Sequence, residues 1–349
     1  MKANKLQLRR ALNAALFVLL LSVVGTKNAF AQIQDYPVAT LQHNGSISAF
    51  YGSNAFVNAN AAASNGDTIT LSSGNFNGCT VSKAITIHGA GCVMDTVTGM
   101  PRTVLGSLRI AQTDNLLSLM IEGVYISEII FGSYGNSNLN ITKNGYIKKC
   151  NIGSINHSYG GDFYNSYFED CIINSFNFSG VGCTFNNCVM KLNDYSQTDR
   201  DNPNAILNSV VLLENGVGMD RTVVMNSIIK TADNNSHTNS SFFNNIGIKK
   251  GTTSIFEDMY YSTNMEVNDY ADVFETFNGT VTYDNIYQLK EEILNTFPGN
   301  DGTQVGIYGG IAPYNTYLPY MIMKRCNVAG STDSNNKLSI EIELRDNGE

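Results

Sequence analysis

The chain has 349 residues, of which 15% are charged, with 31 glycines, 6 prolines and no tryptophan. This composition favours short strands joined by tight turns. The formal net charge of −8 argues against nucleic acid or an anionic lipid surface as a partner, because both repel an acidic protein. A polyanionic substrate would need a local basic cleft, and the sequence has no dense Lys/Arg cluster to supply one.

Residues 1–31 have the pattern of a secretory signal peptide. An apolar run at 11–24 is followed by the small-residue site Ala29-Phe30-Ala31 and is preceded by the basic residues Lys2, Lys5, Arg9 and Arg10. We expect export to the periplasm, the outer surface or the medium, with a mature chain that starts near Gln32 and has no transmembrane segment. Loss of five positive charges and no acidic ones takes the net charge from −8 to −13.

The next segment, 32–65, is predicted to cap the front of the fold. Asn54 can cap a short alanine-rich helix from Ala55 to Ala63, and Asn65-Gly66 can end it.

The middle of the chain contains an internal repeat. Tyr146–Ile152 resembles Tyr167–Ile173 and Thr184–Met190, and similar units follow in which serine replaces the cysteine. Anchors at positions 150, 171, 188, 209, 227 and 246 are separated by steps of 21, 17, 21, 18 and 19. A period of about 20 residues is typical of one coil of a β-solenoid. Apolar and polar residues alternate within each unit, as in a strand with one buried face.

These repeats predict a stack of parallel strands between 66 and 283, of about ten coils from the ~20-residue period. The segments 84–89 and 119–126 are expected to form earlier coils of the same stack. Cys150, Cys171 and Cys188 should then lie above one another in the core, with Ser209 and Ser227 continuing the row.

The last segment, 284–349, is predicted to cap the rear. Asp284 can start an amphipathic helix whose Ile286, Leu289, Ile293 and Leu294 share one face before Pro298-Gly299 ends it. Strand-like runs at 319–328 and 337–344, joined by a polar stretch, predict a terminal hairpin.

The chain resembles the pectin-lyase-like right-handed parallel β-helix proteins exported by Gram-negative bacteria. The resemblance rests on 65–74 with 85–91, which are similar to their opening coil, on the repeats, and on the glycine-rich segment 301–310, which is similar to a closing module of uncharacterised members. It implies an all-β, right-handed parallel β-helix with an N-terminal capping helix and a C-terminal helix and hairpin. It implies no single activity, because members include polysaccharide lyases, hydrolases, tailspikes and non-catalytic adhesins.

Seven cysteines in an exported chain raise the question of disulfides. The number is odd and three lie at matching repeat positions, so we expect mostly free, buried thiols, with Cys79–Cys92 and Cys183–Cys326 as the alternative pairs. The four histidines are scattered and form no ligand spacing with a cysteine pair, so no metal site is predicted. Asp199 and Asp201 leave open a calcium ion as a cofactor.

Candidate catalytic residues lie in a polar insertion between two coils and just before the next coil: Asp199, Arg200, Asp201, Asp220 and Arg221. Carboxylates about 5–10 Å apart can act as acid and base on a glycosidic bond. In lyases that share this fold, an arginine neutralises a uronate or abstracts a proton. The alternative is that these residues are solvated turns whose charges pair locally.

Candidate glycan platforms are Tyr159, Tyr164 and Tyr195, because exposed tyrosine rings stack on sugar faces. The alternative is that they pack at coil corners. His157 is similarly a turn residue or a catalytic base.

Three functions follow for an exported β-helix. The first, which we favour, is non-catalytic binding of a polysaccharide, a surface glycan or a neighbouring surface, since no matched catalytic motif is present. The second is a polysaccharide lyase or glycoside hydrolase, which would need the three aspartates and an arginine to converge. The third is a structural protein of the cell envelope. The sequence leaves the oligomeric state open.

Overall fold

In this computed structural model, residues 36–94, 99, 101–111, 118–131, 141–157, 162–197, 199, 201–232, 235, 237–251, 255–256, 263–282, 285–315, 321–328 and 340–346 are described. The expected signal peptide and Arg200, Tyr159 and Asp284 lie outside them.

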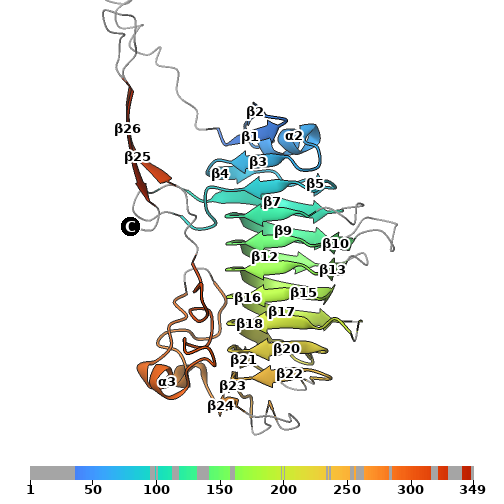
Figure 1. Ribbon diagram of the computed structural model, residues 1–349, viewed down its shortest axis with the longest axis vertical. Coiled ribbons are helices and arrows are strands. Elements are labelled where there is room, and N and C mark those ends of the chain that lie inside the picture. Colours follow the sequence, from blue (N-terminus) through green and yellow to red (C-terminus); the bar gives the residue numbers. More distant parts are fainter. Residues whose placement is uncertain are drawn as a thin grey trace, which may run out of the picture. The chain divides into compact units, whose positions relative to one another are not determined.

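The chain from 37 onwards folds as an all-β parallel solenoid built from two long sheets, whose strands stack along the vertical direction of Figure 1. The first sheet contains, in stacking order, β2 (Ser46–Tyr51), β1 (Val38–His43), β3 (Thr68–Leu71), β6 (Thr86–His88), β8 (Met120–Glu122), β11 (Tyr146–Lys148), β14 (Tyr167–Glu169), β16 (Thr184–Asn186), β18 (Asn204–Leu207), β20 (Thr222–Met225) and β22 (Ser241–Phe243).

The second sheet alternates with the first along the chain. It contains β4 (Gly74–Phe76), β7 (Thr103–Ile110), β9 (Tyr125–Phe131), β12 (Asn151–Asn156), β15 (Ile172–Val181), β17 (Val189–Ser196), β19 (Val210–Leu213), β21 (Ile228–Lys230), β23 (Ile246–Ile248) and β24 (Met265–Val267). Three short strands pair at its side: β5 (Thr80–Val81), β10 (Ile141–Lys143) and β13 (Asp162–Tyr164).

The parallel β-helix fold is confirmed, and its coils return about eight times. Our estimate of ten was too high because the early coils are long. Ile87 pairs with Ile121, and Ile121 with Ile147, so both of these returns exceed the period of ~20 residues. Later returns are shorter, as between Phe168 and its partner Phe185 on the next coil. The handedness of the coil stays a prediction.

From β11 to β22, each first-sheet strand places a central apolar side chain in the core, and the residues on either side of it point outward. The central residues stack in register and are buried: Ile147, Phe168, Phe185, Ile206, Val224 and Phe242. Phe168 and Phe185 stack with their ring centroids 4.8 Å apart. Continuous burial of this kind supplies the main favourable free energy of a solenoid.

The predicted row of cysteines is confirmed and continues further than expected. The Sγ atoms of Cys171 and Cys188 lie 3.4 and 3.5 Å from backbone carbonyls of the preceding coil, Ile147 O and Phe168 O. Ser227 Oγ donates similarly to Ile206 O, and Asn245 Nδ2 to Val224 O. The row therefore reaches Asn245, so our last anchor, at 246, was wrong by one position.

Burial raises the pKa of Cys171 well above its usual value, so this thiol stays protonated and unreactive. Cys79 and Cys92 are free, so that alternative disulfide is not formed. The Cys183–Cys326 alternative is wrong as well, because Cys183 is not part of a disulfide.

We expect Cys171→Ser to change the free energy of unfolding by less than about 1.5 kcal/mol. The serine hydroxyl can donate to the same carbonyl, as Ser227 does to Ile206 O of the coil that precedes it. Cys171→Ala, which removes the donor, should cost more. Urea unfolding followed by circular dichroism measures both variants, and an alanine variant more stable than the serine variant would refute the assigned role of this row.

The N-terminal end is covered as predicted, with an addition. Helix α2 (Ala55–Ala62) follows Asn54 and buries Phe56 and Ala59 in the core. The Asn54 side chain does not cap the helix; its Oδ1 accepts a hydrogen bond from Asn77 Nδ2. We had not predicted that β1 and β2 pair as an antiparallel hairpin or that β1 pairs with β3. The hairpin pairs with the first strand of the parallel stack, β3, and leaves the exposed strand β2 as the end of the sheet.

The C-terminal helix is shorter than predicted. Helix α3 spans Glu291–Thr296, after the 3₁₀ helix η1 (Tyr270–Asp272). Leu289 precedes α3 and bridges to Phe274, while Ile286 and Leu294 are exposed. The predicted apolar face is therefore divided between an extended stretch and one short helix. The terminal hairpin is present as antiparallel strands β25 (Met321–Val328) and β26 (Ile340–Asp346).

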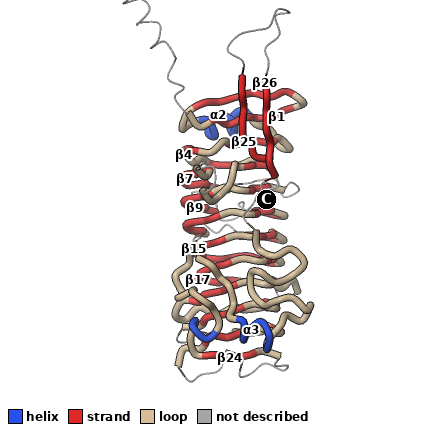
Figure 2. The backbone as a smooth tube through the Cα atoms, turned by 90° about the vertical axis from the view of Figure 1, so that its left-hand side faces the viewer, coloured by secondary structure: helices blue, strands red, loops and turns tan. Residues whose placement is uncertain are grey.

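Residues 273–282 and 285–307 pack on the outer face of the second sheet, whereas we had expected the chain from 284 onward to cap the end of the stack. That face is apolar, and the buried residues Ile172, Val189, Val210, Ile228 and Ile246 form a column along it. Against them pack Phe274, Phe277, Tyr287, Leu289, Ile293, Val305 and Ile307. We call this cluster the lateral core. Figure 2 shows the loops and α3 of this segment beside the strands. Among the described residues, the outer face of the first sheet has no such buried apolar column.

Candidate functional site

The predicted pair Asp220 and Arg221 is close together at a coil corner. Arg221 Nη1 lies 2.8 Å from Asp220 Oδ2 and donates a 2.6 Å hydrogen bond to Gln197 O. Asp220 Oδ1 accepts a 2.5 Å hydrogen bond from Thr238 Oγ1. Both charges are therefore satisfied locally, which is the alternative that the sequence left open.

The structure links Asp199 and Asp201 to Arg221 through Gln197. The Gln197 side chain accepts a hydrogen bond from Asp199 N, and Asp199 Oδ1 accepts one from Asp201 N. Both aspartates are exposed. Neither forms a hydrogen bond with Asp220 in the described part of the chain. The loop thus lies next to the arginine, but the carboxylate of Asp199 accepts a hydrogen bond within its own turn and forms no ion pair with the described side chain of Arg221. Among described residues, no three His, Cys, Asp or Glu side chains gather as metal ligands.

A hollow of about 270 Å³ lies beside this corner. It is lined by Pro203, Arg221, Thr222, Val223, Asn239 and Ser241. Val223 and Ser241 point outward from β20 and β22, so the hollow opens onto the outer face of the first sheet.

Of the predicted tyrosine platforms, Tyr195 is held inside a corner. Its ring lies 5.0 Å from that of Phe178, and its hydroxyl is 2.6 Å from Thr222 Oγ1 and accepts a hydrogen bond from Asn204 Nδ2. Burial raises the pKa of Tyr195. Tyr164 is half-buried in β13, and His157 Nε2 lies 3.5 Å from Asp194 Oδ2. The structure does not bring these residues together as one site.

Sequence reasoning missed a charged column on the outer face of the first sheet. Register pairs His88 with Glu122, Glu122 with Lys148, and Lys148 with Glu169 on successive coils. His88 Nδ1 lies 3.3 Å from Glu122 Oε2, and Lys148 Nζ lies 2.8 Å from Glu169 Oε2. The column ends in Asn186, Leu207, Met225 and Phe243.

The carboxylates of this column are held ionised. The hydrogen bond with His88 lowers the pKa of Glu122 despite burial. Burial acts to raise the pKa of Glu169, but hydrogen bonds from Lys148 and Tyr146 outweigh it and keep that pKa below its usual value. A general acid needs a raised pKa, so neither glutamate is suited to protonate a leaving group.

Beside the charged column runs a second one, which we call the tyrosine column: Met120, Tyr146, Tyr167, Thr184, Ala205, Val223 and Ser241. The rings of Tyr146 and Tyr167 lie on adjacent coils with centroids 5.4 Å apart. The Tyr146 hydroxyl donates to Glu169, which fixes its ring. The repeat unit itself, with tyrosine at the same place in two consecutive copies, was the signal that could have identified this pair.

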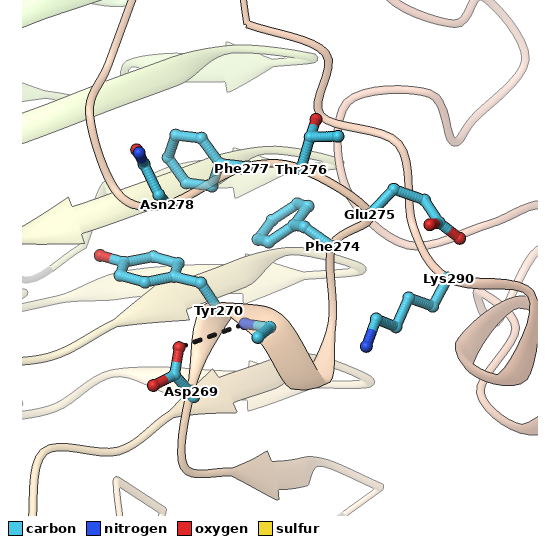
Figure 3. A pocket seen from close by; sticks show the side chains of 9 residues that line it. Asp269, Tyr270, Phe274, Glu275, Thr276, Phe277, Asn278 and Lys290 are labelled. Carbon is cyan, nitrogen blue, oxygen red and sulfur yellow. Dashed lines mark hydrogen bonds between the residues drawn. The ribbon is translucent and has the colours of Figure 1, made fainter.

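A second hollow, of about 260 Å³, lies at η1. Figure 3 shows Tyr270, Phe274 and Phe277 lining it, with Asp269 bonded to the backbone of Ala271. Because Phe274 and Phe277 belong to the lateral core, we assign these rings to packing.

No family model, curated protein or solved structure that we compared matches this chain. In the part of the chain that the structure describes, no helix is long and apolar enough to cross a membrane. By its fold, the chain belongs to the class of parallel β-solenoids.

Proposed function

We propose that the protein is an exported, non-catalytic binding protein that holds a glycan chain along the tyrosine column. The observation that carries the proposal is the pair Tyr146 and Tyr167, placed on adjacent coils of an outward-facing sheet. A ring with an apolar face and a polar edge suits a sugar, whose faces are apolar and whose rim is hydroxylated.

The charged column supports the same reading. Its ion pairs place both hydrogen-bond donors and acceptors beside the tyrosine rings on the outer face of the first sheet. Such a mixture suits the hydroxyl groups of neutral sugars, which donate and accept. A solenoid repeats its side chains at a fixed spacing of about 4.8 Å, so a ligand that also repeats can make equivalent contacts on several coils. The basic and apolar segment before Gln32 supports export.

A polysaccharide lyase or hydrolase is the second candidate, and one observation favours it. Asp170, which follows Glu169, is buried, and burial together with the neighbouring Glu169 charge raises its pKa to about 7. A carboxyl group that is protonated near neutral pH can serve as a general acid.

We expect Tyr146→Ala/Tyr167→Ala to weaken retention on immobilised polysaccharides by about tenfold or more, since each lost ring contact is worth about 1 kcal/mol. Affinity electrophoresis through gels containing neutral plant, algal and host polysaccharides measures this. Tyr51→Ala, which removes an exposed tyrosine of the N-terminal hairpin, is the matched control. Equal retention of the unaltered protein, the double variant and the control would refute the site. Absence of retention by the unaltered protein would refute the function.

A further inference from the structure

Arg221 occupies an unusual backbone position. Its φ of 48° is left-handed, and the corresponding corners of other coils have Asn144, Asn165, Gly182 and Asn239. Asparagine and glycine adopt this conformation readily, whereas an arginine there costs about 1 to 2 kcal/mol. Residues held in such a conformation concentrate at functional sites.

The charge of Arg221 is balanced, but its guanidinium has a donor that makes no hydrogen bond with the described residues. Asp220 neutralises the guanidinium, and both side chains are largely buried, at 18% exposed for Arg221 and 29% for Asp220. Arg221 Nε is buried with no hydrogen-bond partner among the described residues. A balanced, buried pair of this kind attracts neither an anion nor a cation strongly, but it offers directed donors and acceptors.

The adjoining hollow lies in line with the tyrosine pair. Its Val223 and Ser241 are members of the tyrosine column, in which Thr184 and Ala205 separate Tyr167 from Val223. Three coil steps at the usual strand spacing place Val223 about 14 Å from Tyr167. Ala205 contributes only a methyl group to this stretch, so the side chains of the column project least from the sheet between Tyr167 and the hollow.

We infer that the Arg221 hollow is a second subsite of the same binding face, which takes one ring of a neutral glycan whose other rings lie on Tyr146 and Tyr167. Val223 supplies an apolar floor, and Arg221, Asn239 and Ser241 supply the polar rim. The charge of Arg221 is balanced by its ion pair with Asp220. The inference rests on the proposed function. It adds a substrate class, since the balanced charges and the acidic chain select against uronate polymers.

A length series of cello-oligosaccharides and manno-oligosaccharides, from the disaccharide upward, tests this by calorimetric titration of the whole protein. We expect affinity to rise by about tenfold at the length that covers about 14 Å beyond the tyrosine pair. Arg221→Asn introduces the residue that most of the equivalent corners have. It should abolish the rise in affinity with length and leave disaccharide binding unchanged. Ser241→Gln, which fills the hollow from an exposed position, should do the same without touching the corner.

The outcomes separate the two proposals. A rise with length that persists in both variants would overturn the subsite while leaving the tyrosine site intact. Tighter binding of oligogalacturonides than of neutral oligomers would overturn the neutral class. Equal loss at every length, including the disaccharide, would show that Arg221 supports the fold and not a separate subsite. If the unaltered protein binds no oligomer, the proposed function fails, and the subsite fails with it.

Discussion

Replacing Asn187 with alanine is expected to lower the free energy of unfolding by about 3 to 5 kcal/mol, from two buried hydrogen bonds and a left-handed backbone position. Asn187 is fully buried at a corner with φ of 52°. Its Nδ2 donates to Ile307 O at 2.7 Å and to Gly309 O at 2.9 Å. Alanine would leave both carbonyls without this donor and would strain the turn.

These bonds belong to a longer contact that runs along the carboxyl ends of the first-sheet strands. Asn226 and Asn300 exchange hydrogen bonds of 2.8 and 3.0 Å, and Asn244 Nδ2 donates to Pro298 O. The segment 298–310, which we call the closing strap, is therefore bound by asparagines from three coils. It connects the lateral core to the residues that precede the terminal hairpin.

Asn187→Gly separates the two causes, because glycine accepts the backbone conformation but lacks the amide. It should destabilise by about 1 kcal/mol less than alanine does. Urea unfolding gives the free energies, and limited proteolysis shows whether the strap is released first. A loss below about 1 kcal/mol for the alanine variant would contradict the role assigned to the strap.

Replacing Asp170 with asparagine is expected to stabilise the protein at pH 8 by about 2 to 4 kcal/mol and to change it little near pH 4. Asp170 lies at the corner position where later coils have Asn187, Asn208, Asn226 and Asn244, and its φ is 53°. It is buried, its Oδ1 has no hydrogen-bond partner among the described residues, and Asn315 N donates to its carboxyl group.

The direction follows from the pKa. Burial, and then the Glu169 charge, raise the pKa of Asp170 from 3.8 to about 7, with Lys149 and Lys148 opposing this. The folded state therefore holds a proton that the unfolded state has released between pH 4 and pH 7. Stability is highest below that window and falls as the pH rises through it, whereas the asparagine variant cannot titrate.

Thermal unfolding of both proteins between pH 4 and pH 8 measures the difference. Subtracting the two curves removes the contributions of the histidines and the other carboxyl groups. A difference in stability between the two proteins that stays constant with pH would contradict the raised pKa of Asp170. So would an asparagine variant that is less stable than the unaltered protein at pH 8.

The fold was predictable from the sequence because a solenoid uses local rules repeatedly. The alternation around Phe168 and Phe185 gives the strands, and the recurring Cys171 and Cys188 give the register of one coil on the next. The lateral core was not predictable in the same way. The outward residues of the second sheet, such as Val189 and Val210, belong to apolar runs in which periodicity alone does not show what covers them.

The candidate site was found only in part. Asp220 and Arg221 are adjacent in sequence, so their pairing needed no knowledge of the fold. Glu122, Lys148 and Glu169 are separated by unequal intervals in the sequence, and only the exact coil lengths place them on one face. Tyr195 was chosen for its loop position, but the strand β17 continues through it and carries its ring into the corner.

The most direct test of binding without cleavage measures retention and product on the same sample. The protein is incubated with each polysaccharide that retains it, and new reducing ends and the absorbance of unsaturated uronate are followed. We predict lasting retention through Tyr146 and Tyr167 with no product. Product that appears with the unaltered protein and disappears with Asp170→Asn or Glu169→Gln would contradict the account and identify an enzyme.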